Sequence, residues 1–447
     1  MSARMNWGNL LSVVRLGREG ETPGKDVRSE FQRDFDRIVY SSAFRRLQDK
    51  AQVFPLAESD YVRTRLTHSL EVSCVGRSLG TLAGALVAKL EGSAIPAAAE
   101  FGNVVAAACL AHDIGNPPFG HSGEDAIREW FLRAGTVYLD GLSPPERVDL
   151  EKFEGNAQGF RILTRLQNPS NLGGLQLTHA TLAVFTKYPR LSVVSGLVDS
   201  KNVSEKKFGV YTDDVEAFSR AAQDTGLLRK FDGAWVRHPL AFLMEAADDI
   251  CYRIVDLEDG CRVGRVSFEE TEPLLWVIAF PNGDKLADQN YQAIRDWKNR
   301  IEYLRARAIN NMIYAVVEAF KNNYDAIMKG QFESDLVATC EYASQAEQIR
   351  ALSASKIYSA SQVVQIEAAG FEVMSGLLDK FVPTLLRETG KRSLAEKKLL
   401  ELIPPQFREQ QSAYKALLSA TDHVSGMTDS YAVRLFRRLK GIELPRG

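Results

Sequence analysis

Hydrophobic residues recur at helical spacing along most of this chain. Between residues 69 and 90, the apolar positions fall close to the 3.6-residue period of an amphipathic helix. Thr67 lies just before this segment and is placed to cap its start. Residues 103–111 are almost all apolar, which favours a helix that is buried on every side.

The same period returns in three later segments, at residues 240–257, 297–320 and 369–386. Strand-like runs are few, and residues 191–198 and 210–212 are weak candidates for a small β-hairpin. No Gly/Ser-rich linker, internal repeat or low-complexity tract divides the chain. We therefore predict an all-α fold with one helical body, a helical C-terminal extension and at most one small β-hairpin.

Composition and charge narrow the class of protein. The 447 residues include 55 basic and 57 acidic side chains, so the net charge of −2 gives no general attraction to nucleic acids. Five cysteines without a CxxC pair are typical of reduced thiols in a cytosolic protein. Residues 104–110, the most apolar stretch, are too few to span a bilayer, and residues 1–16 lack a signal-peptide pattern. These features predict a cytoplasmic protein that does not bind membranes.

Six histidines are present, and His112 is the first in an unusual setting. It is followed directly by Asp113 at the end of the apolar segment, where buried polar groups are costly unless a partner compensates them. A hydrogen-bonded structural pair at a helix end would also explain this dipeptide, so the pair alone does not identify a functional site.

The residues that follow favour a functional site. Residues 114–124 contain three glycines and two prolines, which is more than an ordinary turn needs. This loop brings His121 and Glu124 to a spacing of three, which places both side chains on one face if a helix begins there. A carboxylate in that position can orient the imidazole for general acid or base catalysis.

Two further regions add groups that suit a metal ion. His68 lies well upstream of His112, three residues after Arg65. The acidic pair Asp248 and Asp249 interrupts an otherwise apolar helical segment, so one carboxylate is expected to point inward, where it needs a cation. A mixed set of imidazoles and carboxylates without thiolates suits Mn²⁺, Fe²⁺ or Mg²⁺ better than a structural zinc site.

The order of His68, the His112-Asp113 pair and a later aspartate resembles the HD phosphohydrolase superfamily, and longer motifs resemble its dGTPase family. These motifs are residues 45–54, 65–69, 112–124, 153–158, 186–189, 247–250 and 422–429. The run HDIGNPPFGH, from His112 to His121, is the most specific of them. The resemblance covers the chain from about residue 26 to about residue 260 and resumes near the C-terminus.

This resemblance implies an N-terminal helical segment (residues 1–60), an HD core (61–265) and a C-terminal helical region (266–447) that closes the pocket and makes oligomer contacts. It implies hydrolysis of dGTP or several dNTPs at the α-phosphorus, which yields a deoxynucleoside and inorganic triphosphate. The implied metal ligands are His68, His112, Asp113 and Asp248. The ion would be Mn²⁺ or Mg²⁺, with Fe²⁺, Co²⁺ or Ni²⁺ as alternatives.

Substrate contacts follow from the same resemblance. Asp248 is preferred to Asp249 as a ligand because it shares one helical stripe with Tyr252 and Asp256. In the family, the position of Tyr252 packs on the sugar, and the position of Asp256 accepts a hydrogen bond from the 3′-hydroxyl. Ordinary helix packing would also explain both residues. The other implied contacts, to the 3′-hydroxyl, the base and the phosphates, are Gln52, Val53, Arg65, Asn156, Lys187 and Tyr188.

His121 and Glu124 match the catalytic pair of the family. His121 would either protonate the departing 5′-oxygen or assist the attacking water, and the sequence leaves both roles open. The preferred base also stays open, because it depends on the far end of the pocket, where Glu367 is one candidate.

Partners and rival functions are implied as well. The family commonly forms hexamers or other homo-oligomers, and some relatives respond to an activating dNTP or to single-stranded DNA. A basic cluster at Arg33, Arg37, Arg45 and Arg46 is a candidate effector surface, although ion pairs with neighbouring acids would explain it too. The alternative functions are another HD-type nucleotidase or phosphodiesterase, and a nucleotide-sensing or DNA-binding regulator.

Overall fold

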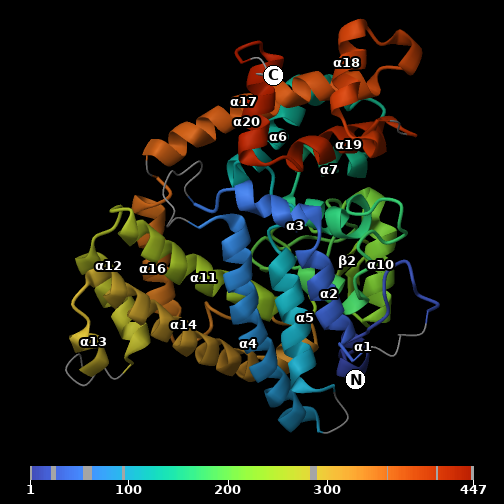
Figure 1. Cartoon of the computed structure of the whole chain (residues 1–447). Helices are drawn as coiled ribbons and strands as arrows, with labels where there is room; N and C mark the ends of the chain where they lie inside the picture. The colour runs from blue at the N-terminus through green and yellow to red at the C-terminus, as the bar shows by residue number, and fades with distance from the viewer. Residues whose placement is uncertain are drawn as a thin grey trace.

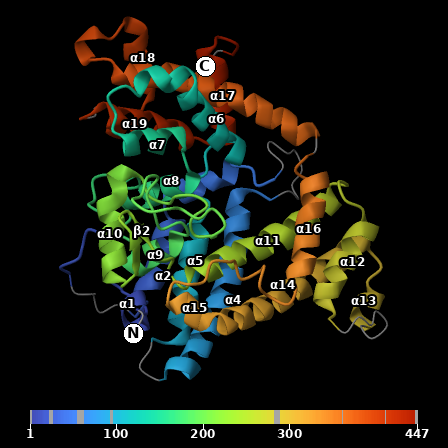
Figure 2. The same ribbon diagram turned by 180° about the vertical axis from the view of Figure 1, so that it is seen from behind.

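This computed structural model describes residues 3–21, 27–53, 63–92, 96–281, 289–359, 361–408 and 411–443. Helices make up nearly all of the regular structure in these ranges, which confirms the predicted all-α class (Figures 1 and 2).

The first half of the chain surrounds a central helix pair. Its helices are α1 (Trp7–Leu10), α2 (Glu30–Val39), α3 (Ser42–Arg46), α4 (Arg65–Glu91), α5 (Ala98–Ala111), α6 (Gly120–Leu132), α7 (Pro144–Glu151), α8 (Gly155–Arg161), α9 (His179–Phe185) and α10 (Val215–Asp224). Helices α4 and α5 pack along each other, and α2 and α9 cover α5 (Figures 1 and 2). Helix α5 is buried along nearly its whole length because its side chains are apolar on all sides.

The helices of the second half of the chain lie in two groups at opposite ends of the molecule. Its helices are α11 (Ala241–Arg262), α12 (Phe268–Ala279), α13 (Gln289–Ala293), α14 (Trp297–Asn322), α15 (Tyr324–Met328), α16 (Ala343–Lys356), α17 (Ser361–Leu386), α18 (Leu394–Leu402), α19 (Ala413–Ser425) and α20 (Asp429–Leu439). Helices α12, α14 and α16 pack around α11, whereas α17, α19 and α20 gather with α6 and α7 at the opposite end (Figures 1 and 2).

Helix α4 begins before the predicted start, and its cap differs from the prediction. The cap is Thr64, whose side chain and that of Thr67 each bond the backbone N–H of the other, so Thr67 supports the cap as its reciprocal partner. By length and mean hydropathy (1.2) this helix could cross a membrane, but half of its most apolar window is buried inside the protein. Because α4 packs against α5, α11 and α14, it is a core helix of this fold.

The small β-hairpin lies later in the chain than predicted. Strands β1 (Arg229–Phe231) and β2 (Ala234–Trp235) pair antiparallel around Asp232 and Gly233, and Gly233 has a φ of +80°. Gly233 supplies the positive φ at the end of this turn, a conformation that glycine adopts without strain. The prediction at residues 191–198 and 210–212 is wrong, because Leu191 and Val210 form only an isolated parallel bridge.

Two hydrophobic cores determine where a site can form. The larger core contains side chains of α4, α5, α9, α11 and α14. The smaller core lies between α6 and α7 on one side and α17, α19 and α20 on the other. Helix α6 begins shortly after α5 ends, so the short turn between them passes from one core to the other.

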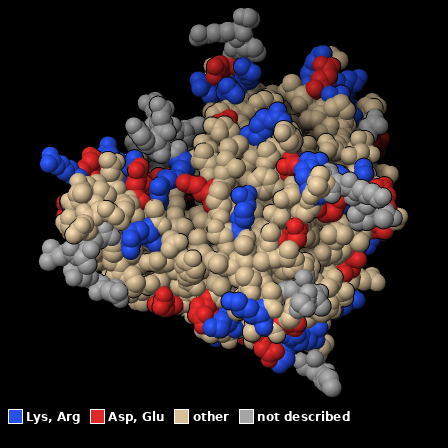
Figure 3. All heavy atoms as spheres, turned by 60° about the horizontal axis from the view of Figure 1, so that its bottom comes forward, with Lys and Arg blue, Asp and Glu red and all other residues tan. Residues whose placement is uncertain are grey.

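Surface charge is mixed on the face shown in Figure 3. Basic and acidic side chains are interspersed there, and much of the centre of the face is uncharged. This distribution agrees with the near-balanced composition of the whole chain.

Candidate active site

Three side chains from three helices meet inside the larger core. His68 lies in the first turn of α4, His112 directly follows α5, and Asp248 lies within α11. Nε2 of His68 is 3.2 Å from Oδ1 of Asp248, and Nε2 of His112 is 3.5 Å from the same oxygen. One potential ligand atom from each residue lies within 4.8 Å of the other two, which suits groups that share one ion.

The ring of His112 is held with Nε2 facing this cluster. Nδ1 lies 2.7 Å from the carbonyl oxygen of Cys109, and a carbonyl can only accept a hydrogen bond, so Nδ1 carries a proton. Nε2 of His112 is buried and has no hydrogen-bond partner among the described residues. A buried imidazole nitrogen that faces a carboxylate fits a divalent cation.

The charges of the cluster depend on one another. Burial lowers the pKa of His112, but the carboxylates of Asp113 and Asp248 outweigh this effect and raise it to about 9. Burial raises the pKa of Asp248, but His112 and His68 hold it well below its usual value. A proton and a cation therefore compete for Nε2 of His112.

Asp113 lies beside the cluster, with both oxygens already engaged. Oδ2 accepts a 2.6 Å hydrogen bond from Nη1 of Arg65, and Oδ1 accepts one of 2.6 Å from Nδ2 of Asn116. Oδ1 also lies 3.5 Å from Nε2 of His112. Burial raises the pKa of Asp113, but Arg65 and His112 hold it below its usual value, so this side chain is a carboxylate. Arg65, predicted as a phosphate contact, here orients Asp113.

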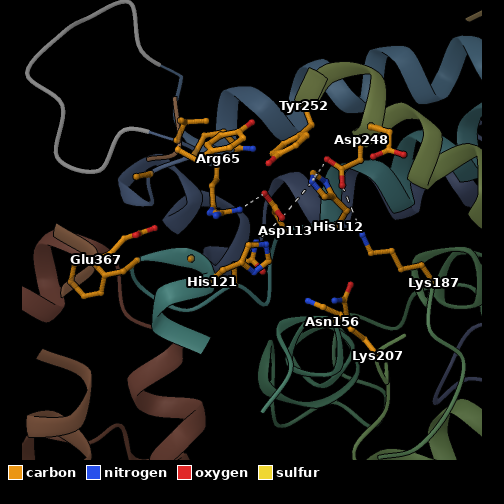
Figure 4. Close-up of a pocket in the computed structure, with 18 of the residues that line it drawn as sticks. Arg65, His112, Asp113, His121, Asn156, Lys187, Lys207, Asp248, Tyr252 and Glu367 are labelled. Carbon is orange, nitrogen blue, oxygen red and sulfur yellow. Dashed lines mark hydrogen bonds and ion pairs between the residues drawn. The ribbon is translucent and has the colours of Figure 1, made fainter. Parts of the chain in front are cut away.

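A cavity of about 530 Å³ opens onto this cluster (Figure 4). Most of the residues proposed from the sequence line it, namely Gln52, Val53, Arg65, His112, Asp113, His121, Asn156, Lys187, Tyr188, Asp248 and Tyr252. The other three residues proposed from the sequence, His68, Glu124 and Asp256, do not line the cavity, and each is only 1% exposed.

His121 enters the cavity from the first turn of α6. Its side chain is 78% exposed, and its Nδ1 lies 2.9 Å from Oε2 of Glu124. Oε1 of Glu124 accepts a 2.7 Å hydrogen bond from the backbone N–H of Gly155. Burial raises the pKa of Glu124, but His121 and Lys207 lower it to about 2. Glu124 is therefore a carboxylate that orients the imidazole and leaves Nε2 of His121 free to face the cavity.

Backbone packing places the turn that carries His121. A Cβ atom at Gly115 would lie 2.0 Å from the carbonyl oxygen of Gly155, so the turn approaches α8 closely. A Cβ atom at Gly155 would lie 2.5 Å from Oε1 of Glu124 and 2.8 Å from Oδ1 of Asn116. Phe119, the residue before α6, has a φ of 63°, a conformation that is strained for a residue with a side chain.

Two lysines supply positive charge on the side of the cavity opposite Glu367 (Figure 4). Nζ of Lys187 lies 3.8 Å from Oδ2 of Asp248. Lys207, which no sequence motif identified, lies 3.2 Å from Oε1 of Glu154 and 3.9 Å from Oε2 of Glu124. Burial lowers the pKa of each lysine, but neighbouring groups, including these carboxylates, raise it above its usual value. Both side chains are therefore ammonium groups.

Two stacked tyrosines also line the cavity. Tyr252 lines it from α11, and the ring of Tyr358 stacks on Tyr252 at 5.5 Å and 15°. The hydroxyl of Tyr358 donates a 2.9 Å hydrogen bond to Oδ2 of Asp256. Tyr358, also missed from the sequence, therefore covers the carboxylate that was expected to accept from the sugar. Gln52 instead presents a buried carbonyl oxygen with no partner among the described residues.

Comparison with known families assigns two parts of the chain. The HD domain family matches residues 65–169, the range that contains the histidines of the site and the His121 turn. The phosphohydrolase-associated domain family matches residues 336–438, the range from just before α16 to nearly the end of α20.

Relatives match the chain from end to end. A deoxyguanosinetriphosphate triphosphohydrolase-like protein of Synechocystis sp. is 43% identical over 98% of this chain and all of its own length. A protein of the same name from Pseudomonas aeruginosa is 40% identical over 99% of this chain and all of its own. The deoxyguanosinetriphosphate triphosphohydrolase of Salmonella paratyphi A is 31% identical over 99% of this chain and all of its own. With the two domain matches, these identities show that the chain belongs to the deoxyguanosinetriphosphate triphosphohydrolase-like family of HD-domain phosphohydrolases.

Proposed function

We propose that this phosphohydrolase is a metal-dependent dNTP triphosphohydrolase, which converts a dNTP to a deoxynucleoside and inorganic triphosphate. One observation carries the proposal: a single cavity joins a metal-type cluster, an oriented histidine and separate ammonium groups. Its volume of about 530 Å³ is in the range of small-ligand pockets. The names of the relatives support the same class of substrate.

His68, His112 and Asp248 would hold the divalent cation, with Asp113 beside them. When bound, such an ion would polarise an oxygen of the α-phosphate and activate a water molecule for attack. Arg65 and Asn116 keep Asp113 in a fixed orientation through two 2.6 Å hydrogen bonds, so this carboxylate needs no rearrangement when the substrate arrives.

The lysines are suited to the phosphate groups. A triphosphate carries several negative charges, and charge-assisted hydrogen bonds from ammonium groups are among the strongest in proteins. Lys187 and Lys207 line the same side of the cavity as Asn156 (Figure 4), and Nζ of Lys187 lies 5.8 Å from the centre of the Tyr188 ring. In the reaction the water oxygen bonds to the α-phosphorus and the bond to the 5′-oxygen breaks. The lysines stabilise the charge on the triphosphate product.

His121 would transfer the proton. Its Nδ1 is held by Glu124, so Nε2 is the atom available to a reacting oxygen. The carboxylate of Glu124 stabilises the imidazolium form in either of the two roles, acid toward the 5′-oxygen or base toward water. At the sugar end, Tyr252 offers a flat apolar surface, and Gln52 offers an acceptor for a hydroxyl.

Product analysis tests the proposal directly. The protein is incubated with Mn²⁺ and each dNTP singly, then with mixtures, and the products are separated by anion exchange. We expect deoxynucleoside and inorganic triphosphate in equal amounts, abolished by a chelator. Pyrophosphate with a nucleoside monophosphate, or orthophosphate alone, would assign the chain to another nucleotide phosphohydrolase. Nucleotide binding without turnover in any metal would favour a regulator.

A further inference from the structure

The turn between α19 and α20 reaches two walls of the cavity. Asp429, the first residue of α20, is 2% exposed. Its Oδ2 accepts a 3.0 Å hydrogen bond from the backbone N–H of Ala51, and its Oδ1 accepts one of 3.0 Å from the N–H of Phe119. One carboxylate therefore ties together two segments that are far apart in the sequence.

Lys50 makes a second connection at the same junction. Its side chain is buried, and the residue is 4% exposed. Nζ donates to the backbone carbonyl of Ser425 at 3.1 Å, at the end of α19, and to the backbone carbonyl of Asn116. Lys50 therefore joins the end of α19, at Ser425, to the turn before α6, at Asn116.

The segments that are joined carry cavity-lining residues. Ala51 is followed by Gln52 and Val53, which form one wall. Asn116 orients Asp113 through its side chain, so the position of its carbonyl affects the carboxylate beside the metal-type cluster. Phe119 immediately precedes the first turn of α6, from which His121 projects.

We propose that Lys50 and Asp429 are positioning residues, through which the phosphohydrolase-associated segment sets the distance between these two walls. We call the four hydrogen bonds that the side chains of Lys50 and Asp429 make to the backbone the clamp. The expected changes in kcat and KM rest on the proposed function. The expected change in how firmly the two walls are held together does not. A buried carboxyl group that accepts from two amides, and a buried amino group that donates to two carbonyls, are costly to leave unpaired, so the walls move together.

A neighbouring contact provides a matched control. Ser430, next to Asp429 on α20, donates a 2.8 Å hydrogen bond to Oδ1 of Asp49. This contact joins the same two parts of the chain, but Asp49 does not line the cavity, whereas Ala51, Asn116 and Phe119, which the clamp contacts, do. Ser430→Ala therefore removes a cross-link between these elements without touching the clamp.

The experiment compares Asp429→Asn, Lys50→Met and Ser430→Ala in the full chain with Mn²⁺. We expect Asp429→Asn to raise KM at least fivefold, because the wall that carries Gln52 is released. We expect Lys50→Met to lower kcat at least tenfold with a smaller change in KM, because Asn116 no longer fixes Asp113. Ser430→Ala should keep both constants within twofold of the unsubstituted protein.

Hydrogen exchange gives a readout that does not need activity. Asparagine keeps only one acceptor oxygen, so in Asp429→Asn at least one of the amides of Ala51 and Phe119 should exchange at least tenfold faster, and in Ser430→Ala neither should. If the protein proves to have another substrate, this result still decides whether the clamp exists.

Two results would overturn the clamp. One is exchange at both amides that is unchanged in Asp429→Asn. The other is kcat and KM within twofold of the unsubstituted protein in both clamp variants. If Asp429→Asn does not fold, Lys50→Met decides, with exchange followed at the peptide that contains Asn116.

Discussion

The two sides of the cavity are built in different ways. The metal side takes His68 from α4, Asp248 from α11 and His112 from the position directly after α5, all helices of the larger core. The proton-transfer side begins at Phe119, and the backbone there is bonded to Asp429, 310 residues away in the chain. Short motifs can therefore specify the reactive groups, while distant segments set the distance between them.

Removing one carboxylate should affect the metal side most. Asp248→Asn leaves the two imidazoles without their shared oxygen, so we expect a loss of several kcal/mol of transition-state stabilisation, which is roughly a 10³-fold fall in triphosphate release. Stabilisation against heat by Mn²⁺ should disappear as well. Asp249→Asn is the control, because Asp249 pairs with Arg253 at 2.9 Å. If Asp249→Asn, rather than Asp248→Asn, lost the Mn²⁺ effect, the assignment of the ligand would be wrong.

A substitution on the proton-transfer side should lower kcat without weakening the binding of the metal ion. His121→Ala removes the cavity-facing imidazole, and we expect kcat to fall by roughly 10²- to 10⁴-fold. Thermal stabilisation by Mn²⁺ should persist, because His121 does not belong to the His68–His112–Asp248 cluster. Glu124→Gln keeps a hydrogen-bond partner and should lose less activity. Equal loss of Mn²⁺ stabilisation in His121→Ala would show that the two sides are not separable.

The ammonium groups of the cavity should contribute to substrate binding as well as to the rate of the reaction. Lys207→Met removes one charge near the proposed phosphate position. Since a hydrogen bond to a charged group contributes about 1.5–3 kcal/mol, KM should rise roughly 10- to 100-fold. Lys206→Met removes the same charge one residue away, outside the cavity, and should leave KM unchanged. Steady-state kinetics at two salt concentrations distinguish the variants, and a similar KM in both would argue against a phosphate contact.

The linked charges at His112 predict a pH dependence of stability for protein treated with a chelator. Because the folded pKa is raised to about 9, its stabilising contribution is complete below the unfolded value near 6.5. The contribution is lost as the pH rises toward 9, by at most about 1.4 kcal/mol per pH unit. Stabilisation by Mn²⁺ should grow over the same range. Thermal unfolding of the protein and of His112→Gln measures both trends, and parallel curves for the two would contradict them.

The smallest expected effect is at the tyrosine pair. Tyr358→Phe removes the hydroxyl that donates to Asp256 and keeps the ring that stacks on Tyr252. Loss of one buried hydrogen bond should lower the free energy of unfolding by about 1–2 kcal/mol. Chemical denaturation measures this change. A KM that rises more than tenfold would indicate that the hydroxyl also contacts the substrate.

The reactive groups could be proposed from the sequence because each lies in a short pattern with a chemical meaning. A His-Asp pair after an apolar run and an i, i+3 His-Glu pair both constrain local geometry. Lys207 offered no such pattern, because it becomes a cavity residue only when its loop folds over Glu154. Tyr358 was missed for the same reason, since its partner Tyr252 lies on a distant helix.

The fold class was predictable from periodicity, whereas local details depended on single residues. The cap of α4 moved to Thr64 because two threonines at a spacing of three can bond each other reciprocally. The hairpin was misplaced because β-branched residues near Val210 suggested a strand, while Gly233 supplied the turn.

The glycine contact between the His121 turn and α8 limits how this protein can be redesigned. One added methyl group at Gly155 would collide with Glu124 and with Asn116 at once. It would therefore disturb the orientation of the imidazole and the support of Asp113 in a single step. Glu367, which lines the cavity on the side away from the lysines, lies outside this constraint.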